Sequence, residues 1–260
     1  MNAKTEVEWT RLLEEAVTKP GTISKAFTLF HDYSIGNAVA VMLQCHMRGI
    51  EPGPIAGYKK WQSLGRQVKG GETALGIFFP IKFKVKEIDD DGNEKEVERM
   101  RFEWKHRVFV LDQTVGDEFV MPAVPGFETA HVLAHFGLSM TKFDIVDGNV
   151  QGYANHKNEI AINPIAAHGF KTWVHEVAHH ALKHTSDECE LDRQTRELEA
   201  EGVALIVGEV LSLDGQDESR AYIQHWWGQG NAVPETSARR IFSAAEAILK
   251  AAKVQVETGE

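Results

Sequence analysis

Apolar side chains recur at helical spacing through the first 48 residues of the chain. Residues 5–18 and 22–31 each predict an amphipathic helix, and the pair Pro20-Gly21 between them rarely continues a helix. Residues 34–48 are apolar enough to form a core helix. The chain is therefore expected to begin with three helices.

The pattern changes from helical spacing to alternation after residue 75. Residues 76–88 alternate basic and apolar side chains in their second half, which predicts a half-buried strand. Asp91-Gly92 favours a hairpin turn, and residues 99–112 predict one or two returning strands. The N-terminal region is thus expected to be a helix-plus-antiparallel-sheet domain. It ends where residues 120–128, with two prolines and a glycine, lose any period.

The rest of the chain is predicted to be mostly helical. A helix is expected near residues 129–137 and short strands between 150 and 163, and further helices follow at residues 170–184, 192–212, 218–226 and 236–252. The predicted class is α+β with two domains. These are residues 1–119 and residues 129–260, joined by a linker at 120–128.

Composition is that of an ordinary globular protein and excludes some classes. Of the 260 residues, 43% are hydrophobic and 25% are charged, and no apolar run approaches the roughly 18 residues of a membrane helix. Glu6 and Glu8 stand where an export signal would be basic and then apolar, and Cys45 and Cys189 lack zinc or disulfide spacing. We expect a cytoplasmic protein with no membrane partner.

The net charge of −10 is unevenly distributed along the chain. Residues 1–110 hold 17 basic and 15 acidic side chains, whereas residues 111–260 hold 11 and 23. Within residues 55–86, seven basic side chains stand against one acidic side chain, with five aromatic residues among them. Cations interleaved with aromatic rings are typical of surfaces that bind single-stranded nucleic acid. A sheet with one face in water gives the same alternation, so both interpretations stay open.

The strongest chemical signal is the segment VHEVAHHALKHT, residues 174–185. His175, Glu176 and His179 form the motif HExxH, and residues four apart share one helix face, so both imidazoles can reach one cation. Zinc lowers the pKa of its bound water to about 7, and Glu176 is placed to accept the proton. The motif predicts a metal site for hydrolysis, with an exposed imidazole-rich helix face as the alternative.

A catalytic zinc ion requires a third protein ligand. Glu199 follows His179 by 20 residues and lies on an otherwise apolar helix face, where an unpaired carboxylate would be costly. Glu197 and Glu201 lie about 200° around the helix from Glu199, so at most one of the three is expected to face the metal. We predict Glu199 as the ligand, with Glu197 as the alternative.

Several segments resemble the ArdC-type antirestriction proteins of plasmids and other mobile elements. The N-terminal segments are FHDYSIGNAVAVMLQ, IAGYKKWQSLGRQVKGGETALGIFFP and RVFVLDQTVGD. The C-terminal segments GYANHKNEIAIN, TWVHEVAHHALKH and ELEAEGVALIV are similar to the zincin-type metallopeptidase domain of that family. The resemblance spans about residues 22–210 and implies a single-stranded DNA-binding domain fused to a zincin-like metallopeptidase domain.

The resemblance also implies a function and a set of site residues. The expected role is protection of incoming DNA from host restriction, with Zn2+ as cofactor and single-stranded DNA as partner. The implied metal ligands are His175, His179 and Glu199, with Glu176 as the catalytic residue. The resemblance marks Tyr33, Asn37, Trp61, Arg66 and Lys69 as DNA-binding. The basic side chains within residues 55–86 add Lys59, Lys60, Lys82 and Lys84 to this set.

Two other functions stay open at this point. A site-specific zinc metallopeptidase would use the same residues to cleave a regulatory protein or a component of the restriction system. A DNA-binding module would instead hold a zinc ion that is only structural.

Overall fold

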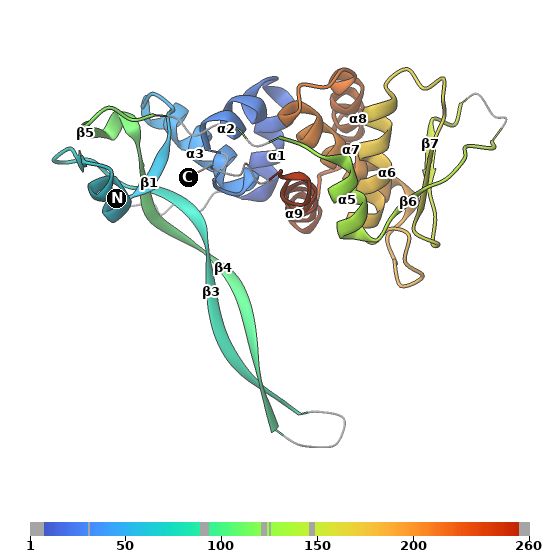
Figure 1. Ribbon diagram of the computed structural model, residues 1–260, viewed down its shortest axis with the longest axis horizontal. Helices are drawn as coiled ribbons and strands as arrows, with labels where there is room; N and C mark the ends of the chain where they lie inside the picture. The colour runs from blue at the N-terminus through green and yellow to red at the C-terminus, as the bar shows by residue number, and fades with distance from the viewer. Residues whose placement is uncertain are drawn as a thin grey trace. The chain divides into compact units, whose positions relative to one another are not determined.

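The described residues fall into two compact units. The structure is a computed structural model, and it describes residues 8–30, 32–88, 94–120, 124, 126–145 and 149–254 (Figure 1). One unit lies within Ala40–Met121, and the other combines Val7–Val39 with Pro122–Glu260. Helices and antiparallel strands are both present, and the predicted α+β class is confirmed. Among the described residues, no helix combines the length and hydrophobicity that crossing a membrane requires.

The first unit contains the second half of α3 (Ile35–Arg48), in which residues 40–45 are buried and all but one of these are apolar. Gln44 is a buried polar residue in this stretch. Its Nε2 donates to the Gly76 carbonyl and its Oε1 accepts from the Gly76 N–H, each at 2.8 Å. Because a buried amide needs partners for both of its ends, this exchange fixes the helix against the start of the sheet.

Five strands of the described residues form the sheets of this unit. They are β1 (Ile55–Gly57), β2 (Arg66–Val68), β3 (Leu75–Ile88), β4 (Glu94–Val110) and β5 (Thr114–Gly116), with the helix α4 (Tyr58–Ser63) and the 3-10 turn η1 (Leu111–Gln113) between them. All pairings are antiparallel, in the order β1-β4-β3 in one sheet and β2-β5 in the other. The predicted return over residues 99–112 is a single strand, β4. The predicted turn at Asp91-Gly92 lies outside the described residues.

The hairpin of β3 and β4 is much longer than the rest of its sheet. β1 pairs only with residues 108–110 of β4, so most of the hairpin has no third strand among the described residues. Figure 1 shows this part as a twisted two-stranded ribbon that extends away from β1 and β5. Most side chains of β4 along the ribbon are exposed or half-buried.

The second unit is organised around α7 (Arg193–Val210). From Leu198 to Glu209 every residue of this helix except Glu201 is buried. The helices that pack most extensively against α7 are α2 (Thr22–Phe30), α6 (Gly169–Ala181), α8 (Gln216–Gly228) and α9 (Glu235–Ala252). Gly202 permits the close approach of α9, because a Cβ at this position would lie 2.8 Å from Cδ1 of Ile241.

A small mixed sheet lies beside α6 (Figure 1). Its central strand is β8 (Glu159–Ile162), which pairs in parallel with β6 (Ser139–Met140) and antiparallel with β7 (Gly152–Ala154). The order β6-β8-β7 makes β7 an edge strand among the described residues. The helix that carries the HExxH motif therefore runs beside a strand edge. A further helix of the unit, α5 (Thr129–Phe136), packs on α9.

The first two helices belong to this second unit, which differs from the predicted domain at residues 1–119. Arg220 donates to the carbonyl oxygens of Ala16 and Val17 near the end of α1 (Trp9–Thr18), at 2.7 and 2.6 Å. The Glu235 carboxylate accepts from the backbone N–H groups of Trp9 and Thr10 at 2.8 and 2.9 Å. Both ends of α1 are thus satisfied by residues more than 200 positions away, and such contacts leave no local pattern in the sequence.

Candidate metal centre and nucleic-acid interface

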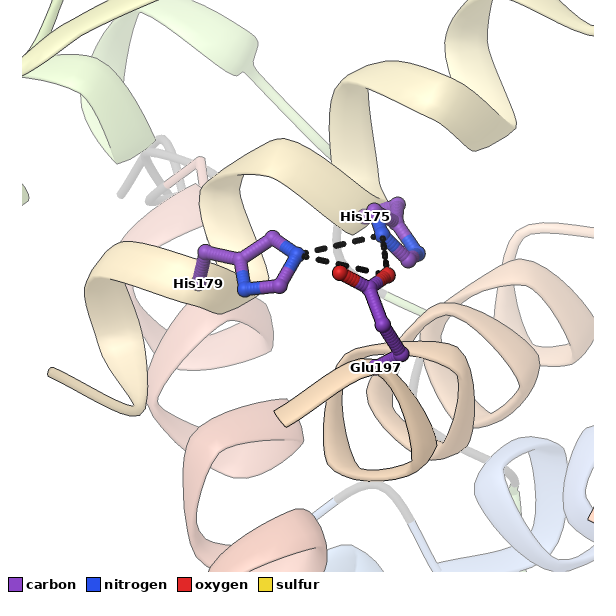
Figure 2. Close-up of side chains that lie close together, drawn as sticks. All are labelled: His175, His179 and Glu197. Carbon is purple, nitrogen blue, oxygen red and sulfur yellow. Dashed lines mark hydrogen bonds and ion pairs between the residues drawn. The ribbon is translucent and has the colours of Figure 1, made fainter. Parts of the chain in front are cut away.

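Helix α6 holds the two imidazoles of the HExxH motif on one side. Its buried face is formed by Trp173, Val174 and Val177, and this apolar packing sets the rotation of the helix. His175 and His179 lie one turn apart, and their Nε2 atoms approach to 3.2 Å (Figure 2). Two imidazole lone-pair positions at this distance point to a shared proton or a shared cation.

Glu197 of α7 completes the group that could hold a metal ion. Its Oε2 lies 3.4 Å from His175 Nε2 and 3.9 Å from His179 Nε2 (Figure 2). Four ligands placed tetrahedrally at about 2.0–2.2 Å from zinc have neighbouring donor atoms roughly 3.3–3.6 Å apart. The distances of 3.2 and 3.4 Å are close to this range, and that of 3.9 Å is longer. The nitrogen and oxygen donors are of the kind that bind a divalent cation.

Glu199, the third ligand predicted from the sequence, lies elsewhere in the structure. Its side chain is fully buried, and its Oε2 accepts hydrogen bonds from His184 Nε2 at 2.9 Å and from Arg240 Nε at 3.0 Å. Burial opposes the carboxylate, but the hydrogen bonds and the charge of Arg240 outweigh it and lower the pKa of Glu199. Hydrogen bonds from His184 and Arg240 therefore stabilise the carboxylate on this apolar helix face.

His184 connects this buried pair to the metal centre. Its Nδ1 lies 3.1 Å from Nδ1 of His179, while its Nε2 contacts Glu199. A histidine that ligates a metal through one ring nitrogen is usually oriented by a hydrogen bond at the other nitrogen. In this structure the orienting partner of His179 is His184, which Glu199 holds in place.

Glu201 contacts His175 at Nδ1, whereas Glu197 lies beside the Nε2 atoms. Glu201 Oε1 lies 3.2 Å from Nδ1 of His175, and its other oxygen contacts Ser219 and Lys171. Of the three glutamates, Glu197 alone belongs to the group of described residues that could hold a metal ion, which is consistent with the expectation that at most one of them faces it. Glu197 and Glu201 are one helical turn apart and share a face of α7, whereas Glu199 points to the opposite side.

Glu176 lies beside the imidazoles at the edge strand. It is 6% exposed, and burial raises the pKa of its carboxyl to about 7. A Cβ at Gly152 of β7 would lie 3.0 Å from Glu176 Oε1, so glycine is needed for the strand to approach the motif. A buried carboxyl with a pKa near neutrality is suited to accept a proton in a reaction.

The carboxylates of the site favour a positive charge between the two imidazoles. Burial opposes a charge on His175, but Glu197 and Glu201 outweigh it and raise the pKa of His175 to about 10. Burial and the nearby charge of His175 lower the pKa of His179 to about 3. The carboxylates thus stabilise one positive charge between the two rings, and a divalent cation would satisfy the same field.

A cleft of about 1080 Å³ opens on the metal centre. One wall is formed by β7 with its flanking residues, and another by His175, Glu176 and His179 of α6. Glu197 and Glu201 contribute the α7 side. Because β7 pairs only with β8 among the described residues, its second edge faces this space with unpaired backbone groups.

Three of the predicted DNA-binding residues have structural partners instead. Trp61 is fully buried and its Nε1 donates to the Phe109 carbonyl at 2.9 Å. Arg66 donates to the Thr114 hydroxyl at 2.8 Å and to backbone carbonyls of β5 and the residue after it, and Lys69 donates to the Asp112 carbonyl. Trp61 in particular cannot stack on a base without unfolding its surroundings.

The lysines of β3 are neutralised across the hairpin. Lys82 pairs with Glu98 and Lys84 pairs with Glu96, each at 2.8 Å. Lys86 pairs with Glu94 in the same way, at 2.7 Å. The three lysines of β3 are therefore part of an electrically balanced surface.

The remaining predicted DNA-binding residues are spread over both units. Lys59 and Lys60 are exposed on α4. Tyr33 is half-buried and Asn37 is buried, and both lie within Val7–Val39, the part of the N-terminal region that belongs to the second unit. Seven of the nine predicted residues therefore lie in the first unit and two in the second.

The roles of some side chains depend on tertiary contacts. The sequence does not fix the roles of Glu201 and His184, which follow from their contacts with the two imidazoles. On β4, the odd positions Arg99, Arg101, Lys105 and Arg107 form a second alternating basic pattern. That pattern was present in the sequence, in a segment interpreted only as strand.

The chain is similar to known antirestriction proteins in sequence and in fold. Residues 3–109 match the family model described as the N-terminal domain of anti-restriction factor ArdC. The metal-free crystal structure of the antirestriction protein ArdC from the R388 plasmid is 22% identical to the chain, with 94% of each chain covered and a TM-score of 0.49. The Mn(II)-bound structure of that protein is 18% identical, covers 96% of this chain and 99% of that chain, and has a TM-score of 0.51. The latter similarity shows a shared fold, and no curated protein matches the chain.

Proposed function

We propose that the chain binds single-stranded DNA and carries a metal-dependent hydrolytic site. Its N-terminal domain and its fold are of the ArdC antirestriction type. In this proposal the protein protects incoming DNA from host restriction. The observation that carries the hydrolytic part is the convergence of His175, His179 and Glu197 beside the buried Glu176.

His175, His179 and Glu197 would hold the ion. Two imidazoles and one carboxylate are the donor set of many hydrolytic zinc sites, which supports zinc. The R388 relative has a structure with Mn(II), so manganese is a second candidate for this chain. A divalent ion at this position supplies Lewis acidity to a water molecule and to the carbonyl oxygen of a substrate.

The side chains around the ion have separate tasks. Glu176 accepts the proton of the attacking water at its carboxylate and can return it to the leaving group. His184, held by the buried Glu199 and by Arg240 beyond it, keeps the His179 ring in orientation. Glu201 lies beside Nδ1 of His175 and performs the corresponding task for that ring.

The edge of β7 supports a polypeptide as the substrate. An extended peptide can pair with an exposed strand edge through main-chain hydrogen bonds. Such a peptide would lie in the cleft between β7 and the motif helix, with a carbonyl group near the ion. A protease that cleaves a regulatory protein or a restriction component is therefore the second candidate function.

Replacement of Glu176 separates these possibilities. We expect Glu176→Gln to keep its metal by elemental analysis and to lose peptide cleavage by at least about 100-fold, because general base catalysis contributes that much or more. Glu190→Gln changes an exposed carboxylate outside the cleft and serves as the control. Transfer of an unmodified plasmid into a restricting host then measures protection. If Glu176→Gln protects as well as the wild type, cleavage is not the protective activity.

A further inference from the structure

The two faces of the β3–β4 hairpin differ in charge. In a strand, successive side chains point to opposite faces, so the register of the hairpin assigns each residue to one of them. The even-numbered face carries the three pairs of lysine and glutamate that join β3 to β4. Its positive and negative charges cancel, and it offers little to a polyanion.

The odd-numbered face carries more basic than acidic side chains, together with aromatic and aliphatic ones. From residue 99 to 107, β4 contributes four basic residues and one acidic residue, Glu103. Phe79, Ile81, Phe83 and Val85 of β3 lie on the same face. We refer to nine residues of this face as the odd face: Phe79, Ile81, Phe83, Val85, Arg99, Arg101, Glu103, Lys105 and Arg107.

Guanidinium groups lie over the aromatic rings of the odd face. Arg107 is 4.3 Å from the centre of the Phe79 ring, and Arg101 is 5.4 Å from the centre of the Phe83 ring. Phe83 is 37% exposed, which is high for a phenylalanine. The rings and cations therefore form one mixed surface rather than separate patches.

The single carboxylate of the odd face is shared. Arg101 and Lys105 both contact Glu103, so one negative charge serves two cations. For Arg107 the structure records no carboxylate partner among the residues it describes. Arg107 thus adds a positive charge that no carboxylate of the described residues balances, and the odd face is complementary to an anionic ligand.

Among the described residues, no third strand pairs with the ribbon beyond β1, and an isolated two-stranded ribbon is only marginally stable in water. Aromatic side chains on such a ribbon gain little from burial within the protein. A ligand that covers them would supply the missing contacts.

We propose that the odd face binds single-stranded nucleic acid. Arg101, Lys105 and Arg107 would contact phosphates, and Phe79 and Phe83 would stack on bases. This combination fits single strands because their base faces are accessible, whereas a duplex offers mainly phosphates to a flat surface. The inference rests on the proposed function, in which the strand is DNA, and it assigns that binding to a surface.

The test compares two double variants of the full-length protein that remove the same charge. Arg101→Gln with Arg107→Gln changes the odd face, and Lys82→Gln with Lys84→Gln changes the even face of the same ribbon. Fluorescence anisotropy measures binding of a labelled oligothymidylate over a salt series. Thermal melting confirms that each variant is folded.

We expect the odd-face variant to bind at least about tenfold more weakly, with the slope of log K against log salt reduced by about 1.4, since each lost phosphate contact removes about 0.7. The even-face variant should stay within about twofold of the wild type. Phe83→Ala should weaken binding by about tenfold with an unchanged slope, because a stacked base carries no counterion.

Other outcomes overturn the inference in distinguishable ways. If the wild type binds and both double variants weaken equally, net charge explains the effect and the odd face is not the site, although DNA binding stands. If the wild type does not bind the oligonucleotide, the DNA part of the proposed function falls as well. Competition by poly-glutamate or by duplex DNA as strong as by unlabelled single strands would indicate a different partner.

Discussion

At the scale of single residues, three glutamates of α7 occupy different environments within five positions. Glu197 is partly exposed beside the imidazoles, Glu201 contacts Nδ1 of His175, and Glu199 is fully buried against His184 and Arg240. Helical periodicity accounts for this separation, because residues two apart point to opposite sides. The same residue type therefore serves as a proposed ligand on one side and as a structural anchor on the other.

Glu199→Gln should be less stable than the wild type without metal, whereas Glu197→Gln should differ from the wild type only when metal is present. In chelator, Glu199→Gln should lower the free energy of unfolding by about 3 kcal/mol, because it breaks a buried pair. Glu197→Gln should then resemble the wild type, but added metal should no longer raise its melting temperature. Thermal melts with and without metal measure both effects. Loss of metal stabilisation by Glu199→Gln, without any loss of stability in chelator, would restore Glu199 as the ligand.

At the scale of elements, α1 is held by side chains from α8 and α9. Arg220 of α8 is buried, donates to two carbonyls of α1 and pairs with Glu209 of α7. Carbonyl groups at a helix end lack partners within the helix, so this guanidinium supplies what the local sequence does not. The helix position in the fold follows from that contact.

Replacement of Arg220 should release α1. Arg220→Ala leaves the buried Glu209 carboxylate without its charge partner, and we expect a loss of about 3–5 kcal/mol in urea denaturation. Lys250→Ala, which removes the i,i+4 pair of an exposed lysine with Glu246, should cost less than about 0.5 kcal/mol. Hydrogen exchange should show faster exchange in α1 of the Arg220 variant. Equal losses in the two variants would contradict this assignment.

At the scale of the whole molecule, the second unit has an apolar core that does not depend on a metal. The buried residues of α7 include Leu198, Val203, Ile206 and Val207, and α9 adds Ile241 and Phe242. A core of this kind is the main source of folding free energy in a domain of ordinary size. An ion at His175 and His179 would bind to a structure that already exists.

Metal removal should therefore leave the protein folded. We expect the far-ultraviolet circular dichroism of the chelated protein to equal that of the metal-loaded protein. The melting temperature should fall only by the amount that ligand binding contributes by mass action. Loss of helical signal on chelation would instead support a structural ion, as in small zinc domains that unfold without metal.

Much of the secondary structure was predictable because its signals are local. Apolar periodicity located the long helices, and alternation located the hairpin strands. The short elements β1, α4, β2 and β5 were not predicted, since three to six residues carry too little pattern. The placement of α1 and α2 with the second unit depends on partners more than 200 positions away.

The amino-acid sequence was sufficient to bring His175, Glu176 and His179 together, because the spacing of a single helix turn places both imidazoles on one face. Which glutamate joins them depends on how α7 is rotated against α6, and that rotation follows from the packing of apolar faces of different helices. The hairpin also depends on contacts between distant segments. Alternation identified its basic residues, but only the pairing of β3 with β4 left some of them neutralised and others facing outward, since cross-strand register is set by contacts between segments far apart in the chain.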